Sequence, residues 1–118
     1  MTLKGGKAQA VEDATHYIAL RPEEPWGYSV RGPIYVALGD YRRAIADFTH
    51  IIDTDTGVQA VAAYCTRGVA YEMEGQKDLA KRDFDQAERR APGRTHRVVE
   101  EDRQYVLRLR TLAKARGR

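Results

Sequence analysis

Two aspartates in the middle of the chain have a spacing that suits calcium. Asp53 and Asp55, followed by Gly57, resemble the start of a calcium-binding loop, in which alternate carboxylates coordinate the ion. The twelfth position of such a loop holds a bidentate glutamate, whereas this chain has Tyr64 there. A turn that caps a helix is therefore the better interpretation of this segment.

The other candidates for chemistry are the histidines and the single thiol. His16, His50 and His96 lie in different segments, and none has a second histidine or cysteine three or four residues away, as a zinc site would favour. Cys65 is the sole cysteine, which excludes an internal disulfide and a cysteine-cluster metal site. No nucleophile turn or glycine-rich oxyanion motif surrounds Cys65 or Ser29. The sequence therefore predicts no catalytic residue, no metal and no cofactor, and we expect a protein that is not an enzyme.

A repeated motif indicates the elements that position these residues. The segment Tyr28-x-x-Arg31-Gly32-x-x-Tyr35 recurs 36 residues later as Tyr64-x-x-Arg67-Gly68-x-x-Tyr71. Each copy is followed by an alanine and a phenylalanine four residues apart, Ala44 and Phe48 and then Ala80 and Phe84. Part of the unit also occurs near the start, where Gly5, Ala10 and Asp13 stand 34 residues before Gly39, Ala44 and Asp47. Such self-similarity is typical of repeat proteins, and we expect the chain to open in mid-repeat.

Each unit is expected to form two helices. In the segments 25–38 and 41–52, apolar residues recur at helical rather than alternating spacing. Gly39 and Gly75 stand where the first helix of each pair must end and the chain reverse. Gly32 and Gly68 lie inside that first helix, at a cost of about 1 kcal/mol each. A cost repeated at the same place suggests that these glycines let the second helix approach closely.

An arginine and an aspartate recur with the same period. Arg31 and Arg67 belong to first helices, whereas Asp47 and Asp83 belong to second helices. We therefore expect an arginine–aspartate pair between the two helices of each unit. If exposed, such a pair would contribute only about 0–1 kcal/mol and would set register more than stability.

The motif is similar to the tetratricopeptide repeat. The family signature of an aromatic, a small residue, a tyrosine, an alanine, a phenylalanine and a closing proline is matched by Tyr28, Gly32, Tyr35, Ala44 and Phe48, then by Tyr64, Gly68, Tyr71, Ala80, Phe84 and Pro92. Thr56 replaces the first closing proline, and the junction is two residues longer than the family period of about 34, which should loosen or rotate one repeat against the next. The match covers about residues 5–94.

The resemblance implies an all-α fold, in which antiparallel helix-turn-helix repeats stack as a short right-handed superhelix. We expect one domain over 1–118, with the second helix of a truncated repeat at 5–22, repeats at 25–58 and 61–94, and a capping helix at 95–116. Apolar residues on one side of this last segment, with arginine, glutamate and glutamine on the other, suit a helix that covers an open repeat.

The resemblance also implies a groove that binds a protein or peptide. First helices line the concave side in this family, and the matching residues here are Trp26, Ser29, Pro33, Val36, Ala37, Ala62, Cys65, Val69, Glu72 and Met73. The set is mostly apolar and lacks the lysines, arginines and asparagines with which some members grip a terminal carboxylate. An apolar helix or extended segment of a partner is therefore the better fit. The alternative is that the capping helix or a second copy of the chain occupies the groove.

Two further expectations concern the first half of the chain. The exposed side of the first helix, around Ala10, Ala14, Tyr17 and Ile18, is expected to be covered by a second copy, unless the chain is a piece of a longer solenoid. Pro33 removes an amide donor inside a predicted helix, so either that helix bends near the groove or it begins later.

Charge is distributed unevenly along the chain. The formal charge is +3 overall, but the segment from Arg89 onward contains ten basic and three acidic residues, a local net charge of +7. Nucleic-acid or acidic-partner binding through this basic end is the disfavoured alternative, because the aromatic residues are already used at core repeat positions. No apolar stretch approaches the roughly 20 residues of a membrane span, and no secretory signal is recognisable, so we expect a cytoplasmic protein.

Overall fold

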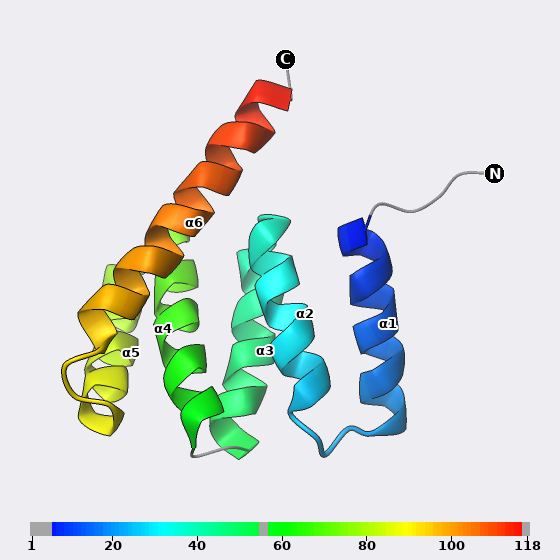
Figure 1. Ribbon diagram of the computed structural model, residues 1–118, viewed down its shortest axis with the longest axis horizontal. Coiled ribbons are helices and arrows are strands. Elements are labelled where there is room, and N and C mark those ends of the chain that lie inside the picture. The colour runs from blue at the N-terminus through cyan, green and yellow to red at the C-terminus, as the bar shows by residue number, and fades with distance from the viewer. Residues whose placement is uncertain (1–5, 55–56, 117–118) are drawn as a thin grey trace.

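The computed structural model describes residues 6–54 and 57–116, and within these ranges it contains helices and no strand (Figure 1). The helices are α1 (Gly6–Leu20), α2 (Trp26–Ala37), α3 (Tyr41–Thr54), α4 (Val58–Met73), α5 (Lys77–Arg90) and α6 (Thr95–Arg116). Each of the first five helices packs against the helix that follows it in the chain. The expected all-α fold is confirmed. The expected effect of the longer junction, and the second aspartate of the calcium-like segment, concern residues 55–56, which lie outside the described ranges.

The glycines predicted to end the first helix of each pair do so. Gly39 and Gly75 have φ angles of 79° and 77°, a left-handed conformation that glycine adopts at little cost. The Asp40 N–H donates to the Tyr35 carbonyl at 2.9 Å, and the Gly39 N–H donates to the Val36 carbonyl at 3.0 Å. The same two bonds recur around Gly75. Both helices therefore end in the same hydrogen-bonded reversal, which sends the next helix back antiparallel.

The glycines inside the first helices mark close helix contacts, as predicted. A Cβ atom on Gly32 would lie 2.9 Å from Cε1 of Phe48, and one on Gly68 would lie 2.8 Å from Cδ1 of Phe84. Real Cβ atoms essentially never come so close to another heavy atom. The phenylalanine ring of the second helix therefore rests directly on the backbone of the first helix in both units.

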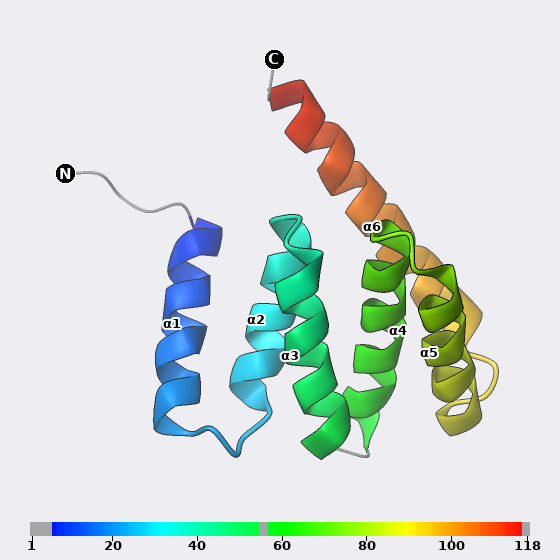
Figure 2. The ribbon, with the colours of Figure 1, turned by 180° about the vertical axis from the view of Figure 1, so that it is seen from behind.

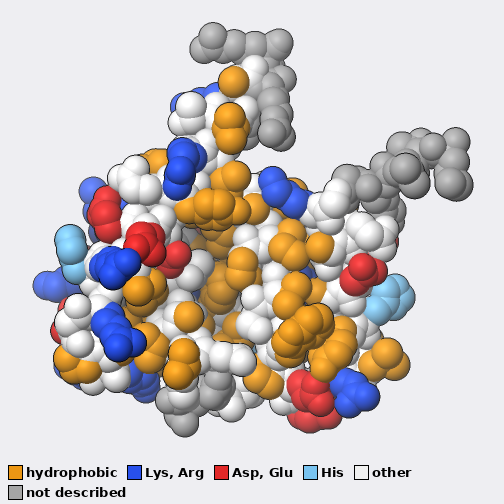
Figure 3. Space-filling view, in the orientation of Figure 1, with side chains coloured by type: hydrophobic (Ala, Val, Ile, Leu, Met, Phe, Trp, Pro, Cys, Tyr) orange, Lys and Arg blue, Asp and Glu red, His pale blue; other side chains and the backbone are white. Residues whose placement is uncertain are grey.

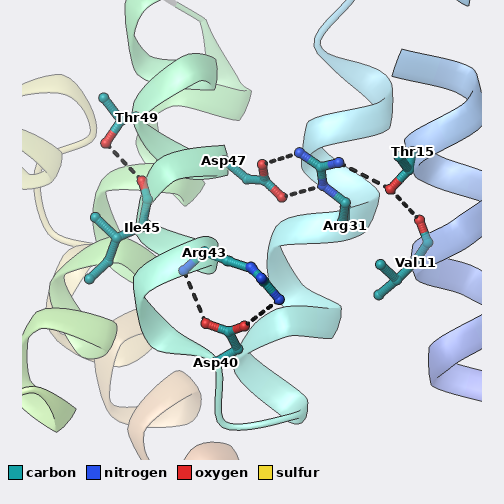
Figure 4. A network of polar contacts seen from close by, with 8 residues as sticks. All are labelled: Val11, Thr15, Arg31, Asp40, Arg43, Ile45, Asp47 and Thr49. Carbon is teal, nitrogen blue, oxygen red and sulfur yellow. Dashed lines mark hydrogen bonds and ion pairs between the residues drawn. The ribbon is translucent and has the colours of Figure 1, made fainter. Parts of the chain in front are cut away.

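The predicted arginine–aspartate pairs are confirmed, and they are more buried than expected. Arg31 donates from Nε and Nη2 to the two carboxylate oxygens of Asp47 at 2.9 and 2.7 Å (Figure 4). Arg67 binds Asp83 in the same way at 2.8 and 2.7 Å. These pairs are not exposed, as the low expected energy assumed: both aspartates are buried, each with 3% of its surface exposed. Bidentate, charge-assisted bonds in a buried setting are the strong form of this interaction.

Each of these arginines also reaches the preceding second helix. Arg31 donates to the Thr15 hydroxyl on α1 at 3.1 Å, and Arg67 donates to the Thr49 hydroxyl on α3 at 3.0 Å. Thr15 and Thr49 are 34 residues apart, the spacing of the partial repeat near the start of the chain. One arginine per unit therefore ties three successive helices together, and α1 occupies beside α2 the place that α3 occupies beside α4.

The last helix lies across the first helices. In Figure 1, α6 runs diagonally in front of α4, while Figure 2 shows α3 and α5 on the opposite side. It packs chiefly on α4 and also reaches α2 and α5. Val99 and Val106 of α6 are buried in the same core as Val36, Phe48 and Val69. None of the described helices is long and apolar enough to span a bilayer.

Candidate binding groove

An apolar hollow lies between the first helices of the two units. Its walls come from Ser29 and Pro33 of α2 and from Ala62 and Thr66 of α4, with Phe48, Ile51, Gln59 and Ala63 beneath and beside them, and its volume is about 130 Å³. We call this feature the α2–α4 groove. Figure 3 shows hydrophobic side chains gathered in a hollow on this side of the molecule.

The groove continues towards the start of α6. A second cavity of about 540 Å³ shares Ala62 and is lined by Gly57, Val58, Val61, Arg90, Ala91, Arg94 and Val98. Val98 begins an apolar stripe along α6 with Tyr105, Leu109 and Leu112, which follow it at helical spacing. Leu109 in turn lines a small hollow beside Val36 and Tyr41. Two residues of the stripe, Val98 and Leu109, therefore line hollows beside the first helices.

Trp26 provides an exposed aromatic surface at the start of α2. Its side chain is 52% exposed, and its ring packs against Tyr17 of α1 with centroids 4.6 Å apart. The Tyr17 hydroxyl donates to the Glu24 carboxylate, which fixes the tyrosine ring. Trp26 is thus held by a neighbouring aromatic while half of its surface remains open to a partner.

The ten predicted groove residues separate into three groups. Trp26, Pro33 and Ala62 are exposed, while Ser29 and Ala37 are partly exposed. Val36, Cys65 and Val69 are buried beneath the surface. Glu72 and Met73 are partly covered by α6, because Arg103 forms a bidentate pair with Glu72 at 2.9–3.0 Å and Arg110 Nη1 lies 3.3 Å from the Met73 sulfur. The α6 helix therefore occupies one end of the predicted groove and leaves the other end open.

Pro33 lies inside α2 without ending it. The helix begins at Trp26 and continues to Ala37, so the later start that was one alternative is not observed. Because proline has no N–H, the carbonyl of Ser29 lacks its usual donor four residues on. Ser29 and Pro33 both line the α2–α4 groove.

The residues predicted to form a self-association face lie on the side of α1 that meets α2. Ala14 is buried, whereas Ala10, Tyr17 and Ile18 are partly exposed. A Cβ on Gly27 of α2 would lie 2.6 Å from Cγ1 of Ile18, so the two helices are in close contact there. Within one copy, α2 already covers much of this face.

One charged group of the groove was not predicted from the sequence. The Thr66 hydroxyl donates to Asp102 Oδ2 at 3.1 Å, which places this carboxylate of α6 at the edge of the groove. Burial raises the pKa of the Asp102 carboxyl, against the opposing effect of the Thr66 hydrogen bond. A sequence signal existed, because Asp102 falls between Val98 and Tyr105 within the apolar stripe of α6.

The thiol of Cys65 is buried, and we expect it to react slowly. Burial raises the pKa of the Cys65 thiol to about 11, with further contributions from Asp102 and Asp83. Because the thiolate is the reactive form, we expect the native chain to react with an aromatic disulfide reagent at neutral pH more than about 100-fold more slowly than the urea-unfolded chain. The release of the coloured thiolate measures both rates. Equal rates before and after unfolding would contradict the buried position of Cys65.

Comparison with known proteins is informative for one segment. Residues 61–94, which include most of α4 and all of α5, match the family model described as tetratricopeptide repeat. No curated protein and no solved structure matches the chain. Among the residues that the structure describes, no group of three or more histidine, cysteine, aspartate or glutamate side chains is placed to hold a metal ion.

Proposed function

We propose that this chain, whose residues 61–94 match the tetratricopeptide repeat, is a tetratricopeptide repeat protein and a non-catalytic module that binds a segment of a partner protein in the α2–α4 groove. The observation that carries this proposal is an apolar surface left open between α2, α4 and α6. Exposed apolar surface that is contiguous and bordered by polar residues marks interaction sites on soluble domains.

Three features in and beside the groove support binding of an apolar segment. Trp26 lies one helical turn before the groove residue Ser29 and offers a rigid aromatic contact, a residue type enriched at the energetic centres of interfaces. Pro33 and Ala62 are exposed but short, so a partner can approach the helix backbones closely. The apolar stripe of α6 supplies a second side for the same segment.

The test is a charged residue placed in the groove. We expect Ala62→Arg to weaken binding of groove-directed peptides, selected from a random displayed library on the wild-type chain, by about tenfold or more, because its guanidinium fills the apolar hollow. Ala46→Arg is the matched control, since Ala46 is an exposed alanine on α3, outside the groove. Titration followed by Trp26 fluorescence measures both affinities. Equal loss in the two variants, or no selected peptide that alters Trp26 fluorescence, would contradict the proposal.

Nucleic-acid binding through α6 is the weaker candidate. Arg97 is paired with Glu101 at 3.1 Å, and Arg103 is paired with Glu72 and Glu100, so part of the positive charge of this helix is already neutralised.

The proposed location of the protein is the cytoplasm. Its single cysteine, Cys65, is a free thiol, which is compatible with the reducing conditions of that compartment.

A further inference from the structure

We propose that the α2–α4 groove selects a partner segment in which a lysine or arginine stands among apolar residues, and that Asp102 is the carboxylate that receives this cation. The inference rests on the proposed function and adds the chemistry of the partner. It follows from the position of Asp102, from its incomplete hydrogen bonding and from the absence of a cation beside it in the described part of the chain.

The position of Asp102 is set by the packing of α6 on α4. Val99 and Val106 are buried on either side of it, so the face of α6 that carries Asp102 is turned towards the body of the protein. The Thr66 hydroxyl, which lines the groove, lies 3.1 Å from Asp102 Oδ2. A side chain entering the groove between Pro33 and Ala62 therefore comes within reach of this carboxylate.

The hydrogen bond to Asp102 is shared with another acceptor. Thr66 Oγ1 also lies 3.1 Å from the carbonyl oxygen of Ala62, one turn back in α4. A hydroxyl has a single proton, so Thr66 satisfies one of these two acceptors at a time. Asp102 therefore has one hydrogen-bond donor, the Thr66 hydroxyl, and it shares this donor with the Ala62 carbonyl.

Three other carboxylates of the repeats each have an arginine partner, which Asp102 lacks within the described residues. Asp47 and Asp83 are each held by a bidentate arginine, and Glu72 is held by Arg103. Within the described residues, the contact from Thr66 is the one hydrogen bond or ion pair that Asp102 makes. The neighbouring charge is that of Glu101, which acts on Asp102 unfavourably. The site therefore has a negative charge whose cation is not supplied by its neighbours.

This arrangement opposes folding of the free chain at neutral pH. Folding raises the pKa of Asp102, so the group favours the folded state most at a pH below its unfolded pKa, and this contribution is lost as the pH rises through the folded value. A burial cost of this kind is relieved when an opposite charge is bound. Lysine and arginine suit the place, because their apolar stems lie along apolar surface while the charged end reaches the carboxylate.

The test compares peptides selected on three forms of the full chain. A random dodecapeptide library is displayed on phage and selected on the wild type, on Asp102→Asn and on Glu101→Gln. Glu101→Gln is the control, because it removes one negative charge from the residue that precedes Asp102. The side chain of Glu101 is exposed and paired with Arg97. Groove occupancy is scored by the change in fluorescence of Trp26, the only tryptophan in the chain. Sedimentation of each form without peptide records self-association.

We expect groove-binding peptides from the wild type and from Glu101→Gln to contain a lysine or arginine among apolar residues, and to bind Asp102→Asn about tenfold more weakly. Asp102→Asn should melt about 2–5 °C higher than the wild type, because it removes a carboxylate that opposes folding. Binding peptides with no basic residue, or a lower melting temperature for Asp102→Asn, would overturn the inference while the proposed function stands. Absence of any groove-binding peptide overturns both. Concentration-dependent dimerisation that Ala62→Arg abolishes would assign the groove to a second copy and also overturn the inference.

Discussion

Replacing Arg67 with alanine is expected to lower the free energy of unfolding by about 3–5 kcal/mol, because the Asp83 carboxylate is then left buried without its cation. The change also removes the hydrogen bond to Thr49 and the packing of the guanidinium, whose central carbon lies 5.6 Å from the ring centres of both Tyr64 and Tyr71. Since domains of this size are stable by only about 5–15 kcal/mol, a large share of the total is affected. Urea unfolding followed by circular dichroism measures the loss.

Two controls separate burial of the pair from loss of charge. Arg43→Ala breaks an arginine–aspartate pair whose side chains are 72% and 34% exposed, and we expect a loss of about 0–1 kcal/mol there. The double variant Arg67→Met with Asp83→Leu removes both charges, and it should recover most of the stability lost by Arg67→Ala. A similar small loss for Arg67→Ala and Arg43→Ala would contradict the structural role assigned to the buried pair.

The fold was predictable because each contact that defines a unit is encoded by two residues at fixed spacing. Gly32 lies against the ring of Phe48, and Arg31 binds Asp47. Both pairs recur 36 residues later. A single glycine in a helix is ambiguous, but a glycine and a phenylalanine that recur together predict a close contact between helices. What spacing alone left open was burial, which changes the expected strength of the arginine–aspartate pairs from weak to strong.

The groove was less predictable, because it depends on the path of α6. Spacing predicts that Val98, Val99 and Val106 belong to a helix with an apolar side, but it does not fix the angle at which this helix crosses α4. That angle brings Arg103 to Glu72 and closes one end of the groove. The same angle brings Asp102 to Thr66 at the open end.

Burial within the first helices was also beyond the sequence resemblance. Val36, Cys65 and Val69 occupy positions matched to groove residues, yet they lie in the core of the protein. The periodicity of a helix gives the relative orientation of its side chains, whereas the neighbouring helices decide which orientation faces solvent. In α4, the helices α3, α5 and α6 pack on more than one side, so its exposed residues are confined to the first turns, at Val58, Gln59 and Ala62.

Replacing Phe48 with alanine is expected to cost about 3–5 kcal/mol, because its ring is 3% exposed and its removal leaves a cavity against the backbone of α2. The effect should depend on residue 32. In the wild type, Gly32→Ala forces its new Cβ to within 2.9 Å of the Phe48 ring, so we expect it to cost about 1–3 kcal/mol. In the Phe48→Ala background that contact is gone, and the same change should stabilise the helix by up to about 1 kcal/mol.

Gly68→Ala is the matched control for this double-mutant cycle. Its Cβ would meet Phe84 and not Phe48, so its cost should be the same with and without Phe48→Ala. Denaturant unfolding of the single and double variants gives both coupling energies. Coupling confined to the Gly32 and Phe48 pair would show that each unit is held by its own glycine and ring, whereas additive costs at Gly32 would mean that the ring does not rest on that backbone. The same result bears on the binding groove, because Phe48 lies in its wall and a ring fixed by Gly32 keeps the surface between Pro33 and Ala62 in one shape before a partner arrives.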